Sequence, residues 1–286
     1  MIVKFFINKE KLKFNEAQAF TEEMIKNLFR EVDSTYIFLT YLKEAGNSIG
    51  LYYKYNNKRE VYRRLTGGPE INFYDDYKYI TILTSRIETL KKIHDRAKNI
   101  AKCISGNEPY GGISISRDKK LLYGITKIGN VGLIEIITNN NTEDFKWCIK
   151  QLLENVSEEK INVKPTQEIA NSYLKDSWIL YGNKTYNIYS SSNNNGFFIN
   201  LNAKIKDDYI EHILLTGNFY ASPPMEPLNA ILSLEGTPIN EVYFYGVKAR
   251  FKKIEIEGIN RDNVFYALDN LSDLLHALKG EDSLRS

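Results

Sequence analysis

The chain has 286 residues, 43% of them hydrophobic, which is enough for one large α/β domain plus a smaller one or for two medium domains. Its 38 basic and 36 acidic residues nearly cancel, which argues against a protein built mainly to grip nucleic acid. No apolar run reaches the roughly 18 residues of a membrane helix. The apolar start Met1–Phe6 is too short for a secretory signal, so we expect a cytoplasmic protein without a membrane span.

The only cysteines are Cys103 and Cys148. Both fall at apolar positions of predicted helices, and their spacing fits neither a zinc site nor a redox pair. We interpret them as small buried side chains of a protein in a reducing compartment.

The first half of the chain alternates between two hydrophobic periods. A strand at the N-terminus is followed by an amphipathic helix over Glu16–Val32. A second helix is expected over Arg86–Ile104, with Gly106 where a helix terminator belongs. Runs rich in Tyr, Ile and Val predict strands at 34–42, 48–55, 60–65, 77–85, 112–116, 120–128 and 131–138.

A helix over Glu143–Asn155 is expected next, because acidic residues crowd its first turn. Its buried stripe is predicted to be Phe145, Cys148, Ile149 and Leu152. The polar stretch Ser157–Lys175 contains Pro165 and is interpreted as a linker that holds at most a short helix.

A domain boundary is expected near 176–185, which divides the chain into residues 1–175 and 176–286. Beyond it, Gly196–Lys206 and Tyr209–Thr216 alternate apolar and polar residues and predict an antiparallel hairpin. The remaining elements are strands at 178–181 and 185–189, a helix at 228–234, strand-like sequence at 242–256 and a final helix at 261–278.

The most informative stretch for function is Arg63-Arg64-Leu65-Thr66-Gly67-Gly68 at the end of a predicted strand. Glycines let a ligand approach the backbone closely, so that N–H groups can face a carboxylate or phosphate. Arginine adds fork-shaped donors to the same anion. An ordinary glycine turn with surface arginines explains the hexapeptide equally well, and the spacing fits neither a Walker loop nor a dinucleotide fingerprint.

This hexapeptide resembles the lipoate-binding loop of the lipoate–protein ligases, relatives of the biotin ligases. The surrounding sequence is also similar to that family. Ser48-Ile49-Gly50 lies upstream, Asp118–Thr126 resembles the hairpin that carries a lysine shortly before a glycine, and Val131–Ile137 resembles the next strand. This first resemblance covers most of residues 15–155.

A second resemblance, to the small accessory domain of the same ligases, lies in the C-terminal part. Phe197–Thr216 matches its hairpin, Gly217-Asn218-Phe219-Tyr220 matches its Gly-Asp-Phe-Phe-like sequence, and Leu228–Gly236 matches the following helix. The resemblance implies an α+β fold with a mixed, largely antiparallel central sheet flanked by helices, followed by a small α+β accessory domain.

The family's reaction has two steps. ATP and lipoate form lipoyl-adenylate, and a lysine of a carrier-protein domain then attacks it. By resemblance, Arg64, Thr66, Gly67, Gly68 and Gly124 would bind the acyl and phosphate groups. Lys120 would be the catalytic cation. The resemblance also implies Mg²⁺ with the ATP, lipoate or octanoate as the acyl substrate, and a lipoyl-carrier domain as the partner. From the balanced charge we expect no nucleic acid as a partner, and the residues predict no protein-bound metal site.

The sequence departs from the family pattern after Gly68, where Pro69-Glu70-Ile71-Asn72-Phe73-Tyr74 replaces a third glycine and a His-Asp pair. Pro69 lacks a backbone donor, and Glu70 adds negative charge beside a phosphate site. Counting back from Gly124 places Leu121 at the lysine position, so Lys120 fits only if the hairpin shifts by one residue.

These departures leave two main hypotheses. The first is an ATP-dependent ligase that attaches lipoate or octanoate to a carrier lysine; an octanoyl transferase would share its fold. The second is a catalytically inactive ligase-like module that recognises a carrier domain or partner. Lys119 or Lys120 pointing toward the loop favours the first, and a site filled by Phe73 or closed by Glu70 favours the second. A biotin ligase is a weaker third idea, because the accessory part resembles lipoate ligases.

The three histidines, His94, His212 and His276, are interpreted as exposed or capping residues.

Overall fold

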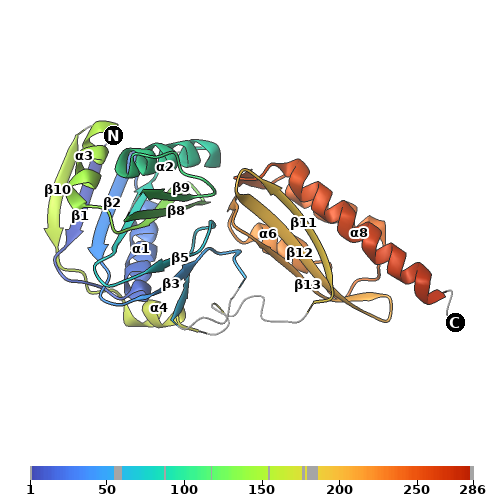
Figure 1. The fold of residues 1–286 in the computed structure, drawn as a ribbon. Helices are drawn as coiled ribbons and strands as arrows, with labels where there is room; N and C mark the ends of the chain where they lie inside the picture. The colour runs from blue at the N-terminus through green and yellow to red at the C-terminus, as the bar shows by residue number, and fades with distance from the viewer. Residues whose placement is uncertain are drawn as a thin grey trace.

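The computed structural model describes residues 2–54, 60–86, 88–116, 118–153, 155–175, 178 and 186–283. Figure 1 shows a large sheet flanked by helices, followed by a second, smaller group of strands and helices. The expected class, α+β with a mixed sheet, is therefore confirmed. The boundary near 176–185 and the predicted strand at 178–181 fall mostly outside the described residues, so the division into 1–175 and 176–286 stays a prediction.

The large sheet has seven strands in the order β10-β1-β2-β6-β9-β8-β7. Strand β1 pairs in parallel with β10 and β2, and the other neighbours pair antiparallel. The strands are β1 (Ile2–Asn8), β2 (Ser34–Tyr41), β6 (Lys78–Thr84), β7 (Ile113–Ser116), β8 (Lys119–Ile128), β9 (Val131–Thr138) and β10 (Val156–Ile161).

Each face of this sheet is covered by helices because alternate strand residues point to opposite sides. Helices α2 (Leu90–Ser105) and α3 (Thr142–Leu152) pack on one face with a core that includes Leu121 and Tyr123. Helix α1 (Phe14–Leu28) packs on the other face with Leu122 and Tyr79. Helix α4 (Gln167–Ser172) packs beside α1.

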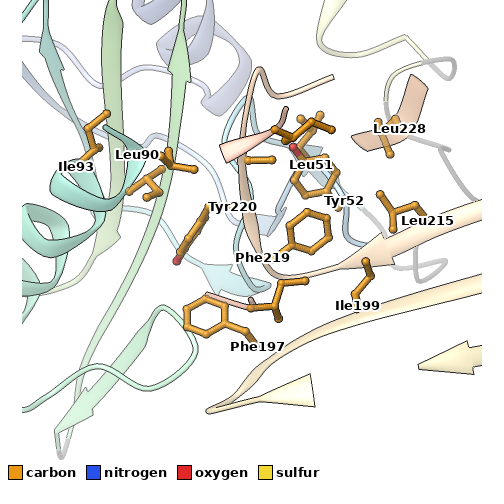
Figure 2. Close-up of a cluster of buried hydrophobic side chains, with 14 of the residues drawn as sticks. Leu51, Tyr52, Leu90, Ile93, Phe197, Ile199, Leu215, Phe219, Tyr220 and Leu228 are labelled. Atoms are coloured by element: carbon orange, nitrogen blue, oxygen red, sulfur yellow. The ribbon is translucent and has the colours of Figure 1, made fainter. Parts of the chain in front are cut away.

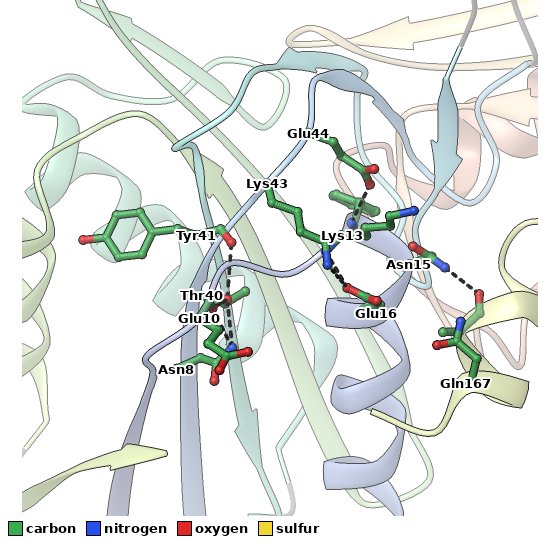
Figure 3. A network of polar contacts seen from close by, with 12 residues as sticks. Asn8, Glu10, Lys13, Asn15, Glu16, Thr40, Tyr41, Lys43, Glu44 and Gln167 are labelled. Carbon is green, nitrogen blue, oxygen red and sulfur yellow. Dashed lines mark hydrogen bonds and ion pairs between the residues drawn. The ribbon is translucent and has the colours of Figure 1, made fainter. Parts of the chain in front are cut away.

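The start of α1 is held by carboxylates (Figure 3). Glu16 accepts the Lys13 backbone N–H at 2.8 Å and pairs with Lys43 at 3.1 Å. Glu44 accepts the Phe14 N–H at 3.0 Å. These contacts satisfy donors that a helix leaves without partners at its N-terminus, and negative charge there is favourable.

A small sheet, in the order β4-β3-β5, carries the glycine loop. It comprises β3 (Gly46–Ile49), β4 (Val61–Arg63) and β5 (Ile71–Phe73). The loop connects β4 to β5, and both strands pair with β3, which lies between them.

The C-terminal part has a three-stranded antiparallel sheet in the order β11-β12-β13 and a two-stranded ribbon of β14 and β15. The predicted hairpin, its turn at Asp207-Asp208 and the final helix are confirmed. The elements are β11 (Ile188–Asn194), β12 (Phe197–Lys206), β13 (Tyr209–Gly217), β14 (Tyr220–Ser222), α6 (Glu226–Leu232), α7 (Glu241–Phe251), β15 (Glu255–Glu257) and α8 (Arg261–Ser283).

Apolar side chains form a continuous core between the two parts (Figure 2). The rings of Tyr52 and Phe219 stack with centroids 4.5 Å apart, and Tyr220 lies between them and the α2 side chains Leu90 and Ile93. Because this core is shared, the C-terminal segment packs directly against the loop-bearing sheet.

Three sequence predictions about elements are wrong. Val156–Ile161, interpreted as linker, is the edge strand β10; backbone pairing with β1 holds it while its polar side chains stay in solvent. The strand-like stretch at 242–256 begins as helix α7, because Asn240 caps it and Phe244, Val247 and Phe251 share one buried face. Leu152 is 42% exposed, at the end of α3, and not part of its buried stripe.

The cysteines are packed in the core as expected, but the interpretation that they form no pair is wrong. Cys103 and Cys148 form a disulfide with Cα atoms 5.9 Å apart. Their spacing of 45 residues matches no local motif, but α2 and α3 pack side by side on the same face of the sheet and bring the thiols together. Among the described residues, none of the helices is long and apolar enough to cross a membrane.

Candidate functional site

The segment Arg64–Gly68 lies between the central strands of the large sheet and the segment Gly217–Tyr220. Its N-terminal end is held by β3 and β4, where the Arg64 N–H bonds the Ile49 carbonyl at 2.9 Å. The structure thus brings Arg64, Thr66, Gly67, Gly68 and Gly124 into one cluster.

Arg63 has a structural role. Its guanidinium donates to the carbonyls of Gly50, Leu51 and Tyr53 at 3.1, 2.9 and 2.6 Å and to that of Trp178 at 3.0 Å. These bonds tie the β3–β4 region together.

Arg64 is completely buried, and its donors face the protein itself. It donates to Ser48 Oγ at 2.8 Å, to the Pro69 carbonyl at 2.7 Å and to the Gly67 carbonyl at 3.3 Å. Burial lowers the pKa of Arg64, and the negative charge of Glu135 opposes that shift. Only Nε has no hydrogen-bond partner.

The loop's anion donors are engaged by a carboxylate of the same chain. Glu135 on β9 is fully buried and accepts the Thr66 backbone N–H at 3.1 Å, together with the Thr66 hydroxyl. Its other oxygen accepts the Tyr79 hydroxyl. Burial, followed by the charge of Glu135, raises the pKa of Tyr79 well above its ordinary value, so this hydroxyl stays a donor.

Two glycines of this cluster, Gly67 and Gly124, lie very close to other segments. A Cβ added to Gly67 would overlap the Phe219 carbonyl oxygen, and one added to Gly124 would overlap Thr66 Oγ1. The Gly68 N–H bonds the Phe219 carbonyl at 3.3 Å. The lack of a Cβ at these glycines therefore lets other segments of the same chain pack closely against them. The sequence had suggested an external ligand at this place.

Lys120 and Lys119 do not reach this cluster. The register of β8 with β9 is unbroken from Leu121 to Ile128, so no bulge shifts the hairpin. Lys120 is exposed, on the same face as Gly124 but about 13 Å away along the strand. Lys119 pairs with Asp144 at 3.1 Å, and Leu121, at the position expected for the lysine, is buried.

The segment that follows β13 closes the loop from the other side. The Tyr220 hydroxyl donates to the Tyr123 carbonyl at 3.2 Å, and the Gly217 N–H donates to the Tyr52 carbonyl at 2.9 Å. Phe73 and Glu70, the side chains suspected from sequence, lie elsewhere: Phe73 stacks on Phe14 in the core, and Glu70 accepts from Asn47.

His94 is buried, so its interpretation as an exposed or capping residue is wrong. Its Nε2 lies 3.0 Å from the Tyr123 hydroxyl and its Nδ1 3.2 Å from Glu257. Strand β15 packs against the face of α2 on which His94 lies, which has a polar sequence. His212 lies 3.7 Å from Glu235 and is about one-third exposed.

The arrangement does not fit a nucleotide phosphate. The backbone N–H and hydroxyl of Thr66 bind Glu135, the Gly68 N–H bonds the Phe219 carbonyl, and a second anion beside this buried carboxylate would meet repulsion of like charge. No group of His, Cys, Asp or Glu in the described part of the chain could hold a metal ion. We derive no step through ATP or Mg²⁺.

Glu135 and Tyr79, which define this cluster, were not predicted from the sequence because both lie within apolar strand patterns. The one sequence signal was the charge of Glu135 inside the apolar run Val131–Thr138, since a charged side chain is buried only when it is paired. Tyr220 belonged to a recognised motif, but its contact with the loop requires the packing of two distant segments.

The fold is similar to that of lipoate–protein ligase structures. P. falciparum LipL1 in complex with lipoate aligns over 96% of this chain and 99% of its own, with a TM-score of 0.64 and 12% identity. A putative lipoate protein ligase from T. acidophilum covers 63% of this chain and 99% of its own (TM-score 0.48, 10% identity). A lipoate-protein ligase A bound with ATP covers 64% and 99% (0.47, 12%). No protein-family model matches the sequence, and no curated protein matches it. The chain therefore shares the fold of lipoate–protein ligases.

Proposed function

We propose that this chain is a ligase-like binding module that recognises a lipoyl-carrier domain or a similar protein partner and does not activate acyl groups. The observation that carries the proposal is the bond between Glu135 and the Thr66 N–H and hydroxyl. A ligase needs those donors for the acyl carboxylate and the α-phosphate, and here the chain supplies its own carboxylate.

Movement of the C-terminal segment alone would not free these donors, because Glu135 and Arg64 both belong to the part of the chain that carries the loop. Arg64 is likewise held by Ser48 and by loop carbonyls. With Lys120 exposed and remote, no lysine near residue 120 is placed to stabilise developing charge at the loop. The carrier domain as partner rests on the family resemblance.

The test is lipoate-dependent ATP–pyrophosphate exchange, repeated with octanoate, beside calorimetric binding of an unmodified lipoyl-carrier domain. We expect no exchange from well-folded protein and measurable carrier binding. Exchange that is lost in Lys120→Ala but kept in the matched variant Lys119→Ala would contradict the proposal and assign Lys120 as the catalytic cation of a ligase. Absence of both exchange and carrier binding would remove the carrier as partner.

The cytoplasmic location, which was predicted from the lack of a long apolar run and of a secretory signal, stays a prediction. A disulfide between Cys103 and Cys148 is rarely retained in a reducing cytoplasm. The redox state of the two thiols in protein isolated from its source cells under acid quench therefore tests the location directly.

A further inference from the structure

A groove of about 530 Å³ lies between strand β11 and helix α8 of the C-terminal part. Figure 1 shows α8 running beside β11, which forms one edge of the three-stranded sheet. The groove is lined by Tyr189, Ser190 and Ser191 of the strand and by Tyr266, Asn270, Asp273, Leu274 and Ala277 of the helix. The helix residues recur at spacings of three and four, so they share one helix face along the strand.

Strand β11 lacks three of the features that usually protect a sheet edge, although α8 packs against it and leaves only the groove open. Its sequence, Ile-Tyr-Ser-Ser-Ser-Asn-Asn, contains no charge and no proline, and it pairs with β12 in unbroken register without a bulge. Natural edge strands are normally blunted by one of these features. The opposite edge, β13, packs against α6 and forms a bridge from Tyr209 to Pro238.

The groove has a mixed lining, and its large side chains are exposed. Tyr189 and Tyr266 are 60% and 59% exposed, and Leu274 is 44% exposed. Ser190 also lines the groove; it is only 5% exposed, and its hydroxyl has no hydrogen-bond partner. A buried hydroxyl without a partner carries a desolvation cost that a ligand donor or acceptor would remove.

Asp273 is the one charged side chain among the described residues that line the groove. It lies on the exposed side of α8, and no basic side chain among those lining residues offsets it. A partner with lysine or arginine opposite Asp273 would complement this charge, whereas an acidic partner would be repelled.

We propose that β11 and α8 form a docking groove for an extended peptide of a partner protein, which adds to the sheet as a strand beside β11. In that arrangement alternate side chains of the peptide face α8. Those inward positions carry apolar residues against Tyr266 and Leu274 and a basic residue against Asp273. The groove shares no residue with the Arg64–Gly68 cluster, so this inference stands apart from the proposed function.

The probe is a fluorescein-labelled peptide, Val-Thr-Lys-Thr-Val-Thr-Lys-Thr-Val, whose inward positions alternate valine and lysine. Binding to the full chain is measured by fluorescence anisotropy. The comparison probes carry glutamate in place of lysine, or backbone N-methyl groups on the threonines and valines. We expect binding of the first probe only, because N-methylation removes the donors that strand pairing needs without changing the side chains.

The protein variants are Asp273→Lys and Tyr266→Ala, both at exposed positions of α8. Their matched controls are Glu159→Lys on β10 and Tyr243→Ala on α7. We expect each groove variant to weaken binding about fivefold to tenfold and each control to leave it unchanged. Equal binding of the N-methylated probe, or no effect of either groove variant, would overturn the proposal. A chain that sedimentation shows to be dimeric, and that Tyr189→Lys converts to a monomer, would overturn it too, because a second copy would then cover β11.

Discussion

Replacing Glu135 by leucine tests the interpretation that this carboxylate closes the loop. The fully buried side chain accepts three donors, the N–H and hydroxyl of Thr66 and the hydroxyl of Tyr79. Leucine has a similar volume and accepts none of them. It also removes the carboxylate whose charge does most to oppose the lowered pKa of the buried Arg64.

The magnitude follows from the kinds of interaction that are lost. A hydrogen bond to a charged group contributes about 1.5–3 kcal/mol, and removal of one partner of a buried charge pair costs about 3–5 kcal/mol. Because these contributions overlap, we expect Glu135→Leu to lower the free energy of unfolding by about 3–5 kcal/mol. Glutamine keeps one acceptor oxygen, so Glu135→Gln should cost about 1.5–3 kcal/mol.

Differential scanning calorimetry of the wild type and both variants measures the effect. A loss of 3 kcal/mol corresponds to a fall in Tm of roughly 6–12 °C for a domain of this size. If Glu135→Leu does not fold, the Tm of Glu135→Gln still measures the contribution of the carboxylate. A Glu135→Leu protein that melts within about 2 °C of wild type would refute the reasoning, since the loop donors would then have another partner.

Three further predictions follow from the contacts described. Cys103→Ser and Cys148→Ser should each lower the free energy of unfolding by about 4 kcal/mol, the loop-entropy value for a 45-residue separation, and reduction of wild type should reproduce the loss in a chemical unfolding titration. Burial, followed by a hydrogen bond to a carboxylate, raises the pKa of Tyr36 to about 12, above its unfolded value. The contribution of the protonated Tyr36 hydroxyl to stability is therefore complete below about pH 10 and is lost as the pH rises toward 12. Tyr36→Phe should make Tm depend less on pH in that window. A double-mutant cycle of Tyr52→Leu and Phe219→Leu should show a coupling of about 0.5–1.5 kcal/mol; a coupling near zero would contradict the stacked contact between the two parts.

Local patterns predicted most elements of the fold. Helix α2 followed from helical periodicity and its end from the position of Gly106, which adopts a φ of 77° in the structure. The β12–β13 hairpin followed from alternation around Asp207-Asp208. Both depend on neighbours within a few residues, so the information lies in the sequence itself.

Elements whose stability comes from distant partners were predicted incorrectly. Strand β10 is polar between Val156 and Ile161 and exists because β1 offers a backbone edge. Helix α7 is apolar on several sides, and only its packing against α6 and α8 selects helix over strand. Secondary-structure preference is weak compared with such tertiary contacts.

The amino-acid sequence by itself determined that a glycine loop follows β4, which glycines it contains and that a ligase-like fold surrounds it. Only the tertiary structure decided what the loop contacts. Glu135 reaches Thr66 across the sheet, and Phe219 lies against Gly67 from the C-terminal part. The physical reason is that a buried donor is satisfied by whichever acceptor the packing brings nearest, and that acceptor can come from any distance along the chain.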